Sequence, residues 1–270
     1  MARIFRHKNL YQFCIGMGFA VFFATAYLYC CRIKNRKCSP PVRDRPAISF
    51  SGCGIRYQFY GGVAEYLLDN FDTKNIDILC VSGGIYAATI LAVGRKMTEW
   101  CDRDWQMCFD YWTRRSLYLF WDTDIFQRTM WRNYLPENAH QICSGRLHIT
   151  VSRLGFYGFY EDIISEYATN EELIDAIIGT IHIPGLFRHI PIVRGKYAFD
   201  GCYMNMMPRT TAKTMFVKLF GRGHIDYGNR LALTKVMSIV IPEYNNGLIR
   251  EGNEIASHSH QTFVEHGFVS

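Results

Sequence analysis

The sequence lacks the patterns that mark disulfide-stapled, zinc-binding and N-glycosylated proteins. Ten cysteines are present, but no two form a CxxC pair, and no Asn-x-Ser/Thr sequon occurs. Cysteines without paired spacing are typical of proteins in a reducing compartment. No repeat or low-complexity tract interrupts the chain. One globular domain of ordinary size is therefore the simplest interpretation, and we expect it to need no cofactor and no metal.

A basic excess is also missing from most of the chain. The formal net charge is +6, but residues 1–45 hold nine Lys or Arg and one Asp, which gives +8. The remaining residues carry 21 basic and 23 acidic side chains, which gives −2. A nucleic-acid interface needs a positive excess on the folded domain, so we expect no nucleic-acid partner.

The positive charge instead flanks an apolar segment. Residues 10–31 contain no charged side chain and are rich in Phe, Ala, Val and Tyr. A helix of this length, rising 1.5 Å per residue, crosses a hydrocarbon core of about 30 Å. The segment therefore predicts a single transmembrane anchor. A signal peptide is the alternative, because Ala24-Thr25-Ala26 is similar to a cleavage site.

The anchor prediction divides the chain into four parts. A basic N-terminal segment, 1–9, precedes the anchor, and a basic proline-rich linker, 32–46, follows it. The linker cannot continue a helix, so the folded domain is expected at 47–270. The positive-inside rule slightly favours a cytosolic location for that domain, because more basic residues follow the anchor than precede it.

The first motif of the domain is a glycine loop between a strand and a helix. Residues 47–51 (AISFS) predict a strand, and residues 59–70 predict a helix. Between them lie Gly52, Cys53 and Gly54. Such a loop presents unpaired backbone N–H groups at a helix N-terminus, where an anion or a developing oxyanion is stabilised. A nucleotide-phosphate loop has a similar pattern, so the motif alone leaves both open.

The second motif is a serine at a strand-to-helix junction. Residues 76–81 (IDILCV) predict a strand, and a small apolar helix is expected at 85–93. Ser82 and Gly84 between them have the spacing of a nucleophile elbow, in which strand and helix backbones pass so closely that the flanking residues must be small. Cys80 stands where such an elbow has its first glycine. A plain strand-to-helix turn is the alternative.

The third motif is an acid before a glycine. Residues 190–199 predict a β-hairpin that turns at Gly195-Lys196, and Asp200-Gly201 follows directly. A carboxylate in a partly apolar site can act as general base toward a serine hydroxyl without a histidine between them. An Asp that merely opens a turn is the alternative.

Together, the three motifs resemble the patatin-like phospholipases, and in particular the branch that contains adipose triglyceride lipase and adiponutrin. The similarity covers about residues 47–210. Ser49 to Gly54 (SFSGCG) resembles the glycine-rich oxyanion loop of that branch, and Asp200-Gly201 resembles the Asp-Gly motif of the family. Residues 169–187 also resemble the helix and Ile-Pro-Gly turn before that motif, and Thr169 and Glu172 have the spacing of a capping box.

The resemblance implies a three-layer α/β fold with a mostly parallel central sheet. It implies a Ser-Asp dyad, in which Ser82 attacks a lipid carboxylic ester and Asp200 takes its proton. It also implies that the N–H groups of Gly52, Cys53 and Gly54 form the oxyanion hole. The expected partners are a membrane lipid substrate, phospholipid or acylglycerol, and the bilayer. No histidine and no metal is implied.

Three departures from the family pattern leave other functions open. They are Cys80 in the elbow, Tyr57 after Arg56, and Cys202 after the Asp-Gly motif. None removes a reacting atom, but together they affect rate and substrate fit. A lipid acyltransferase on the same dyad and a catalytically inactive membrane scaffold are therefore the two alternatives to a hydrolase.

The remaining polar candidates have ordinary explanations. Four histidines follow Asp200, as in many Ser-Asp-His hydrolases, but the chain is short for that arrangement; they are His224, His258, His260 and His266. Arg56 is expected in a surface ion pair, with a phosphate headgroup as the alternative ligand. The aromatic residues of 100–131 are expected in the core, and residues 234–241 predict a further strand.

Overall fold

The computed structural model describes most of the expected domain. The described residues are 45–54, 56–100, 123–156, 158–184, 187, 189–210, 213–219, 223–226 and 242–270. The predicted segment 1–9, the anchor 10–31, most of the linker 32–46, the aromatic stretch 101–122 and the strand 234–241 lie outside them. Within the described ranges, no helix is both long enough and apolar enough to cross a bilayer.

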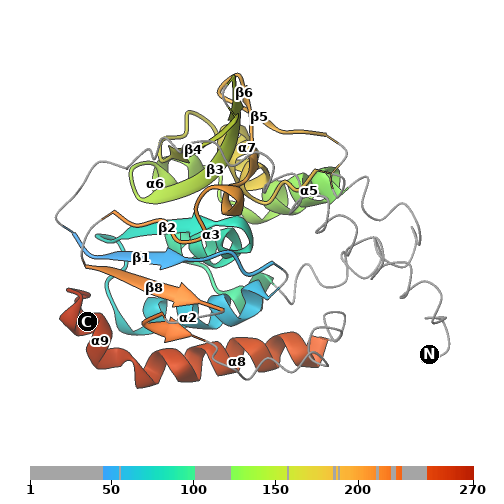
Figure 1. Ribbon diagram of the computed structural model, residues 1–270. Coiled ribbons are helices and arrows are strands. Elements are labelled where there is room, and N and C mark those ends of the chain that lie inside the picture. The colour runs from blue at the N-terminus through green and yellow to red at the C-terminus, as the bar shows by residue number, and fades with distance from the viewer. Residues whose placement is uncertain are drawn as a thin grey trace, which may run out of the picture.

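A seven-stranded sheet forms the centre of the described fold, with the strand order β4-β3-β2-β1-β8-β9 and with β7 paired to β3 (Figure 1). Its strands are β1 (Ala47–Phe50), β2 (Asp77–Val81), β3 (Leu147–Gly155), β4 (Gly158–Ile164), β7 (Phe199–Asp200), β8 (Thr214–Lys218) and β9 (Ile225–Asp226). A separate hairpin is made by β5 (Ile192–Val193) and β6 (Lys196–Tyr197).

Most strand pairs of the sheet are parallel. β1 pairs in parallel with β2 and β8, and β2 pairs in parallel with β3, whereas β4 and β7 run antiparallel to β3. Parallel neighbours bring the carboxyl ends of β1, β2 and β3 to one edge, where ligands bind in open α/β sheets. Every residue of β1 and β2 is buried, so both faces of these strands are covered. The predicted α/β class with a mostly parallel sheet is confirmed.

The helices include the crossovers that parallel strands require. α2 (Tyr57–Asn70) connects β1 to β2, and α3 (Ile85–Val93) follows β2 through a short 3-10 turn, Ser82–Gly84. The other helices are α5 (Thr123–Tyr134), α6 (Ala139–Cys143), α7 (Asn170–Thr180), α8 (Pro242–His258) and α9 (His260–Glu265). The strand at 47–51, the strand at 76–81 and the helices at 59–70 and 85–93 were thus predicted to within two residues.

Glycines allow α8 to pack tightly on α2, which it follows along its length (Figure 1). A β-carbon on Gly62 would collide with the carbonyl oxygen of Ile249, and one on Gly252 would collide with that of Phe59. The two backbones therefore approach more closely than any other residue type would permit. This contact attaches the C-terminal helix to the helix that begins beside the glycine loop.

Two local predictions changed in detail. The hairpin turns at Arg194-Gly195, one residue earlier than predicted, and both residues have positive φ, 52° and 71°. A two-residue hairpin turn of this kind needs positive φ at both positions. In the capping box, the Thr169 hydroxyl accepts from the N–H of Glu172 at 3.2 Å as predicted, but the Glu172 carboxylate accepts from Ala168, one residue before the expected position.

The described aromatic residues of the 100–131 stretch lie in the core, as predicted. Trp100 and Trp131 are almost fully buried, and their ring centroids lie 4.5 Å apart. Trp131 also stacks on Tyr86 of α3. These rings join α3 to α5 on one side of the sheet.

Candidate active site

Ser82 adopts the backbone conformation of a nucleophile elbow. Its φ is 51°, in the left-handed region that a non-glycine residue rarely adopts. A β-carbon on Gly84 would lie 2.6 Å from the carbonyl oxygens of Phe50 and Ser51. Only glycine therefore allows α3 to start this close to the end of β1. The chain turns sharply at Ser82, as the spacing of Ser82 and Gly84 predicted.

The side chains of Ser82 and Asp200 meet in a hydrogen bond. The Ser82 hydroxyl donates to Asp200 Oδ2 at 2.7 Å. The other carboxylate oxygen accepts from the backbone N–H of Cys202 at 2.8 Å. Both residues are buried, with 8% and 3% of their surfaces exposed. A hydroxyl and a carboxylate separated by 118 positions in the chain thus form one polar pair at the carboxyl edge of the sheet.

β3 brings the two residues together. Thr150 of β3 pairs with Val81, which precedes Ser82, and the next residue, Val151, pairs with Asp200 of β7. The Ser152 hydroxyl also donates to the carbonyl oxygen of Asp200 at 2.8 Å. The distance between hydroxyl and carboxylate is therefore set by the register of three neighbouring strands.

Burial changes the acidity of Asp200. Removal from water disfavours the charged carboxylate and raises the pKa of Asp200 to about 6, although the hydrogen bonds from Ser82 and Cys202 oppose the shift. The carboxylate is therefore ionised at neutral pH and is a stronger base than an exposed aspartate. A pKa near the working pH suits a group that accepts a proton and later returns it.

The glycine loop lies directly against the elbow. A β-carbon on Gly52 would lie 3.6 Å from Ser82 Cβ, and one on Gly83 would collide with the carbonyl oxygen of Gly54. Gly54 has a φ of 57°. Among the described residues, no acceptor receives a hydrogen bond from the N–H groups of Gly52, Cys53 or Gly54. The structure thus brings the predicted loop to Ser82, with no acceptor for its amides in the described part of the chain.

Three of the four histidines that follow Asp200 bond to other groups, and the fourth, His258, is exposed. His260 Nδ1 pairs with the hydroxyl of Tyr66 at 2.8 Å, and His266 Nδ1 lies 2.8 Å from the carbonyl oxygen of Thr262. His224 accepts from the N–H of Phe216. In the described part of the chain, no histidine ring bonds to Ser82 or Asp200, and no group of potential metal ligands is found.

The three departures from the family pattern are accommodated differently. Cys80 is fully buried in β2, with its thiol 3.7 Å from the carbonyl oxygen of His148. Tyr57 starts α2 and stacks on Tyr86, with ring centroids 4.1 Å apart. Cys202 places its thiol against Gly52, beside the dyad. Burial raises the pKa of the Cys202 thiol, so it stays protonated and does not compete with Ser82.

Comparison with known proteins agrees with this geometry. A family model described as patatin-like phospholipase matches residues 48–213. The chain belongs to the patatin-like phospholipase family. This is a family of lipid acyl hydrolases and acyltransferases, and the predicted membership is confirmed.

Three curated patatin-like relatives from Mus musculus are similar to parts of the chain. The 1-acylglycerol-3-phosphate O-acyltransferase Pnpla3 is 28% identical over 181 residues, which are 63% of this chain and 42% of the relative. Patatin-like phospholipase domain-containing protein 5 is 31% identical over 34% of this chain and 21% of its own length. An omega-hydroxyceramide transacylase is 32% identical over 75 residues, which cover 27% of this chain and 12% of the relative. The matches span less than half of each relative and support the adiponutrin branch.

Sequence reasoning missed Thr180, a buried threonine in the last turn of α7. Its hydroxyl accepts from the backbone N–H of Ser82 at 2.9 Å and donates to the carbonyl oxygen of Thr150 at 2.6 Å. Thr180 thus ties the strained backbone of Ser82 in this patatin-like domain to β3. The sequence offered one sign of this role, a hydroxyl among the apolar residues at the end of α7. The partners of that hydroxyl are seen only in the folded structure.

Arg56 was predicted in a surface ion pair, and that prediction is wrong. It is only 5% exposed, and neither terminal nitrogen of its guanidinium has a hydrogen-bond partner among the residues that the structure describes. It is the residue before α2, two positions after Gly54. A buried charge without a partner is costly, so this position near the glycine loop favours an anionic ligand.

Replacement of Thr180 by valine should slow the reaction of Ser82 more than it perturbs folding. Thr180→Val removes the acceptor of the Ser82 N–H and the hydroxyl that donates to the Thr150 carbonyl, whereas Thr180→Ser keeps both bonds. We expect labelling of Ser82 by a fluorophosphonate to slow about tenfold in the valine variant, equivalent to about 1.4 kcal/mol. Serine should restore the rate to within about twofold. Labelling at the wild-type rate in Thr180→Val, well below its melting temperature, would contradict this role.

Labelling of Ser82 should also depend on the ionisation of Asp200. Protonation removes the acceptor of the serine proton, so the rate should fall as pH drops through about 6. Between pH 7.5 and pH 5 we expect a decrease of about tenfold, followed with a probe that has no titrating group. A flat profile across this range would show that Asp200 does not control the reactivity of the serine.

Proposed function

We propose that the chain is a lipid acyl hydrolase that cleaves carboxylic esters through a Ser82-Asp200 dyad and an acyl-enzyme. The observation that carries the proposal is the 2.7 Å hydrogen bond from Ser82 Oγ to Asp200 Oδ2 at a strained strand-to-helix turn. A serine hydroxyl is a weak nucleophile unless an adjacent base accepts its proton. The contact provides that base without a histidine.

The proposed reaction has two acyl-transfer steps. Ser82 Oγ attacks the ester carbonyl carbon as Asp200 takes the hydroxyl proton, and negative charge develops on the carbonyl oxygen. The N–H groups of Gly52, Cys53 and Gly54 stabilise that oxygen. The tetrahedral species then expels the alcohol, which takes the proton from Asp200 and leaves an acyl group on Ser82. A water molecule, activated by Asp200, hydrolyses this ester and regenerates the serine.

A lipid acyltransferase is the second candidate, because two relatives carry transferase names. Pnpla3 is described as a 1-acylglycerol-3-phosphate O-acyltransferase, and another relative is described as an omega-hydroxyceramide transacylase. The first half of the proposed reaction serves both functions. In a transferase the acceptor alcohol, rather than water, attacks the acyl-enzyme. Product analysis with a labelled acyl chain, with and without an acceptor alcohol, separates the two.

The unpaired Arg56 supports a phosphate-bearing lipid over a neutral acylglycerol. A buried guanidinium gains most from an anion that accepts several of its hydrogen bonds, and phosphate has the geometry for this. The N-terminus of α2, which follows Arg56, has no acidic residue in its first turn and no side-chain cap. The positive end of the helix dipole favours the same kind of ligand.

The proposed anchor at residues 10–31 would hold this enzyme at its substrate. A lipid ester stays in the bilayer, so an enzyme fixed to the same surface meets it without extraction into bulk water. The basic residues on both sides of the segment favour contact with anionic headgroups.

Fluorophosphonate labelling tests the proposed nucleophile. We expect the wild type to become labelled, Ser82→Ala to lose all label, and Asp200→Asn to react at least about 100-fold more slowly, because general-base assistance contributes at least that factor. Ser257→Ala, at an exposed serine of α8, is the matched control and should label normally. A wild type that takes up no label, or an alanine variant that still does, would refute the dyad.

Substitution of Arg56 should separate charged from neutral substrates. We expect Arg56→Gln to slow hydrolysis of an acylglycerol phosphate about tenfold or more, because charge-assisted hydrogen bonds to the phosphate are lost. Hydrolysis of the monoacylglycerol with the same acyl chain should change little. The variant should melt no lower than the wild type, because it removes an unpaired buried charge. Equal losses on both substrates would contradict phosphate recognition.

A further inference from the structure

Exposed apolar side chains gather on the loops beyond the carboxyl ends of the strands. Leu154 at the end of β3, Ile192 and Tyr197 in the β5–β6 hairpin, and Met206 after Asp200 are each more than half exposed. We call these four residues the entrance rim. Soluble proteins rarely expose several large apolar side chains in one patch, and such patches mark interaction sites.

An apolar path connects the rim to the dyad. Tyr203 lies three residues after Asp200, and its ring is 6.0 Å from that of Phe159 on β4. Phe159 of β4 lies opposite Leu154 of the rim in the antiparallel pairing of β3 with β4. On the other side of the site, a β-carbon on Gly52 would lie 3.8 Å from the terminal methyl of Met206. The rim is therefore continuous with the groups proposed to react.

The hairpin part of the rim is fixed to the sheet by a buried arginine. Arg153 of β3 is 1% exposed and donates from Nη1 to the carbonyl oxygens of Val193 and Lys196 at 3.1 and 2.8 Å. Ile192 and Tyr197 sit opposite each other in the hairpin, so their side chains project from the same side. The exposed apolar groups are thus held on a braced hairpin.

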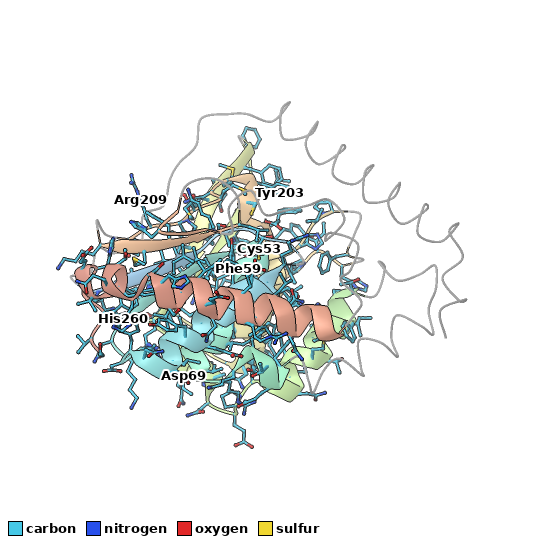
Figure 2. All side chains as sticks on the ribbon, turned by 90° about the horizontal axis from the view of Figure 1, so that it is seen from below. Cys53, Phe59, Asp69, Tyr203, Arg209 and His260 are labelled. Atoms are coloured by element: carbon cyan, nitrogen blue, oxygen red, sulfur yellow. The ribbon has the colours of Figure 1, made fainter. Side chains whose placement is uncertain are left out.

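Two exposed cationic side chains lie on the segments that carry the rim, and the carboxylates nearest to the hairpin, Asp162 and Glu172, are paired with Arg153 and Arg194. Lys196 lies between the two hairpin residues of the rim, and Arg209 follows Met206 by three positions; both are exposed. Within the described residues, neither forms an ion pair with a carboxylate. Figure 2 shows Arg209 and Tyr203 on the side of the molecule away from Asp69. Exposed apolar side chains accompanied by two cations that have no carboxylate partner among the described residues match a surface of anionic lipid, which has acyl chains beneath phosphate groups.

We propose that the entrance rim docks the domain directly on an anionic lipid surface, in addition to any contact made by residues 10–31. The proposal rests on the proposed function for its purpose, because docking at the rim brings lipid esters to the Ser82 side of the sheet. Leu154, Ile192, Tyr197 and Met206 enter the interfacial layer, while Lys196 and Arg209 contact phosphate groups. A second copy of the chain or another protein is the competing occupant.

Tryptophan fluorescence tests the docking without relying on catalysis. Tyr197→Trp and Val269→Trp are made in the full chain, and the wild-type spectrum is subtracted. Val269 is exposed like Tyr197 but follows α9, at the opposite end of the fold from the β5–β6 hairpin (Figure 1). With vesicles that contain anionic and brominated phospholipid, we expect a blue shift and quenching at position 197 and neither at 269. Quenching at both positions or at neither overturns the proposal.

Kinetics of paired variants separate docking from chemistry. In Leu154→Ser/Tyr197→Ser, fluorophosphonate labelling without lipid should match the wild type. Hydrolysis of a long-chain ester in anionic vesicles should fall about tenfold, because two apolar groups no longer enter the lipid. The matched control Val264→Ser/Val269→Ser should change neither rate. Unchanged vesicle hydrolysis, or equal loss of labelling and hydrolysis, overturns docking at the rim.

Failure of the proposed function gives a different result. A wild type that neither labels nor hydrolyses refutes the enzyme, while the fluorescence of Tyr197→Trp still decides the docking. If the rim instead binds a second copy, position 197 should shift to the blue with protein concentration in the absence of vesicles, and that outcome also overturns the lipid proposal.

Discussion

The left-handed backbone of Ser82 is the constraint on which the site depends. A residue with a β-carbon adopts this conformation only when its surroundings compensate for the strain. Here Gly84 allows α3 to start against the end of β1, and Thr180 holds the Ser82 N–H from the opposite side. The strained turn projects the hydroxyl beyond the sheet edge, where a carboxylate from a distant strand can reach it.

β3 is the strand that brings Asp200 to the strained turn at Ser82. It pairs with β2 before Ser82, with β7 at Asp200, and with β4 along its length. Thr150 accepts the hydrogen bond from Thr180, Ser152 donates to Asp200, and Arg153 braces the β5–β6 hairpin. Ser82, Asp200 and the β5–β6 hairpin are therefore positioned by closely spaced residues of one strand, so a shift of its register would displace all three.

Burial changes the properties of two charged groups near the loop, the Asp200 carboxylate and the Arg56 guanidinium. Exclusion of water raises the pKa of Asp200 to about 6 and so makes it a better proton acceptor than an exposed aspartate. The same exclusion makes Arg56 costly without an anion. Among the described residues, a buried arginine whose terminal nitrogens have no partner and a buried carboxylate thus lie near a glycine loop whose amides have no acceptor. This combination suits an ester that also carries negative charge.

Features with local signals could be predicted from the amino-acid sequence alone. Strand, turn and helix around Ser82 follow from short-range hydrophobic pattern and from glycine spacing, and the order of the motifs indicated the family. The sequence did not identify Thr180 as a partner of Ser82, the burial of Arg56, or the rim that joins Leu154 to Met206. These depend on which strands lie side by side, because contacts between distant residues are set by sheet order and register. They became visible in the folded chain, because a local pattern specifies the type of an element and not the residues that it contacts.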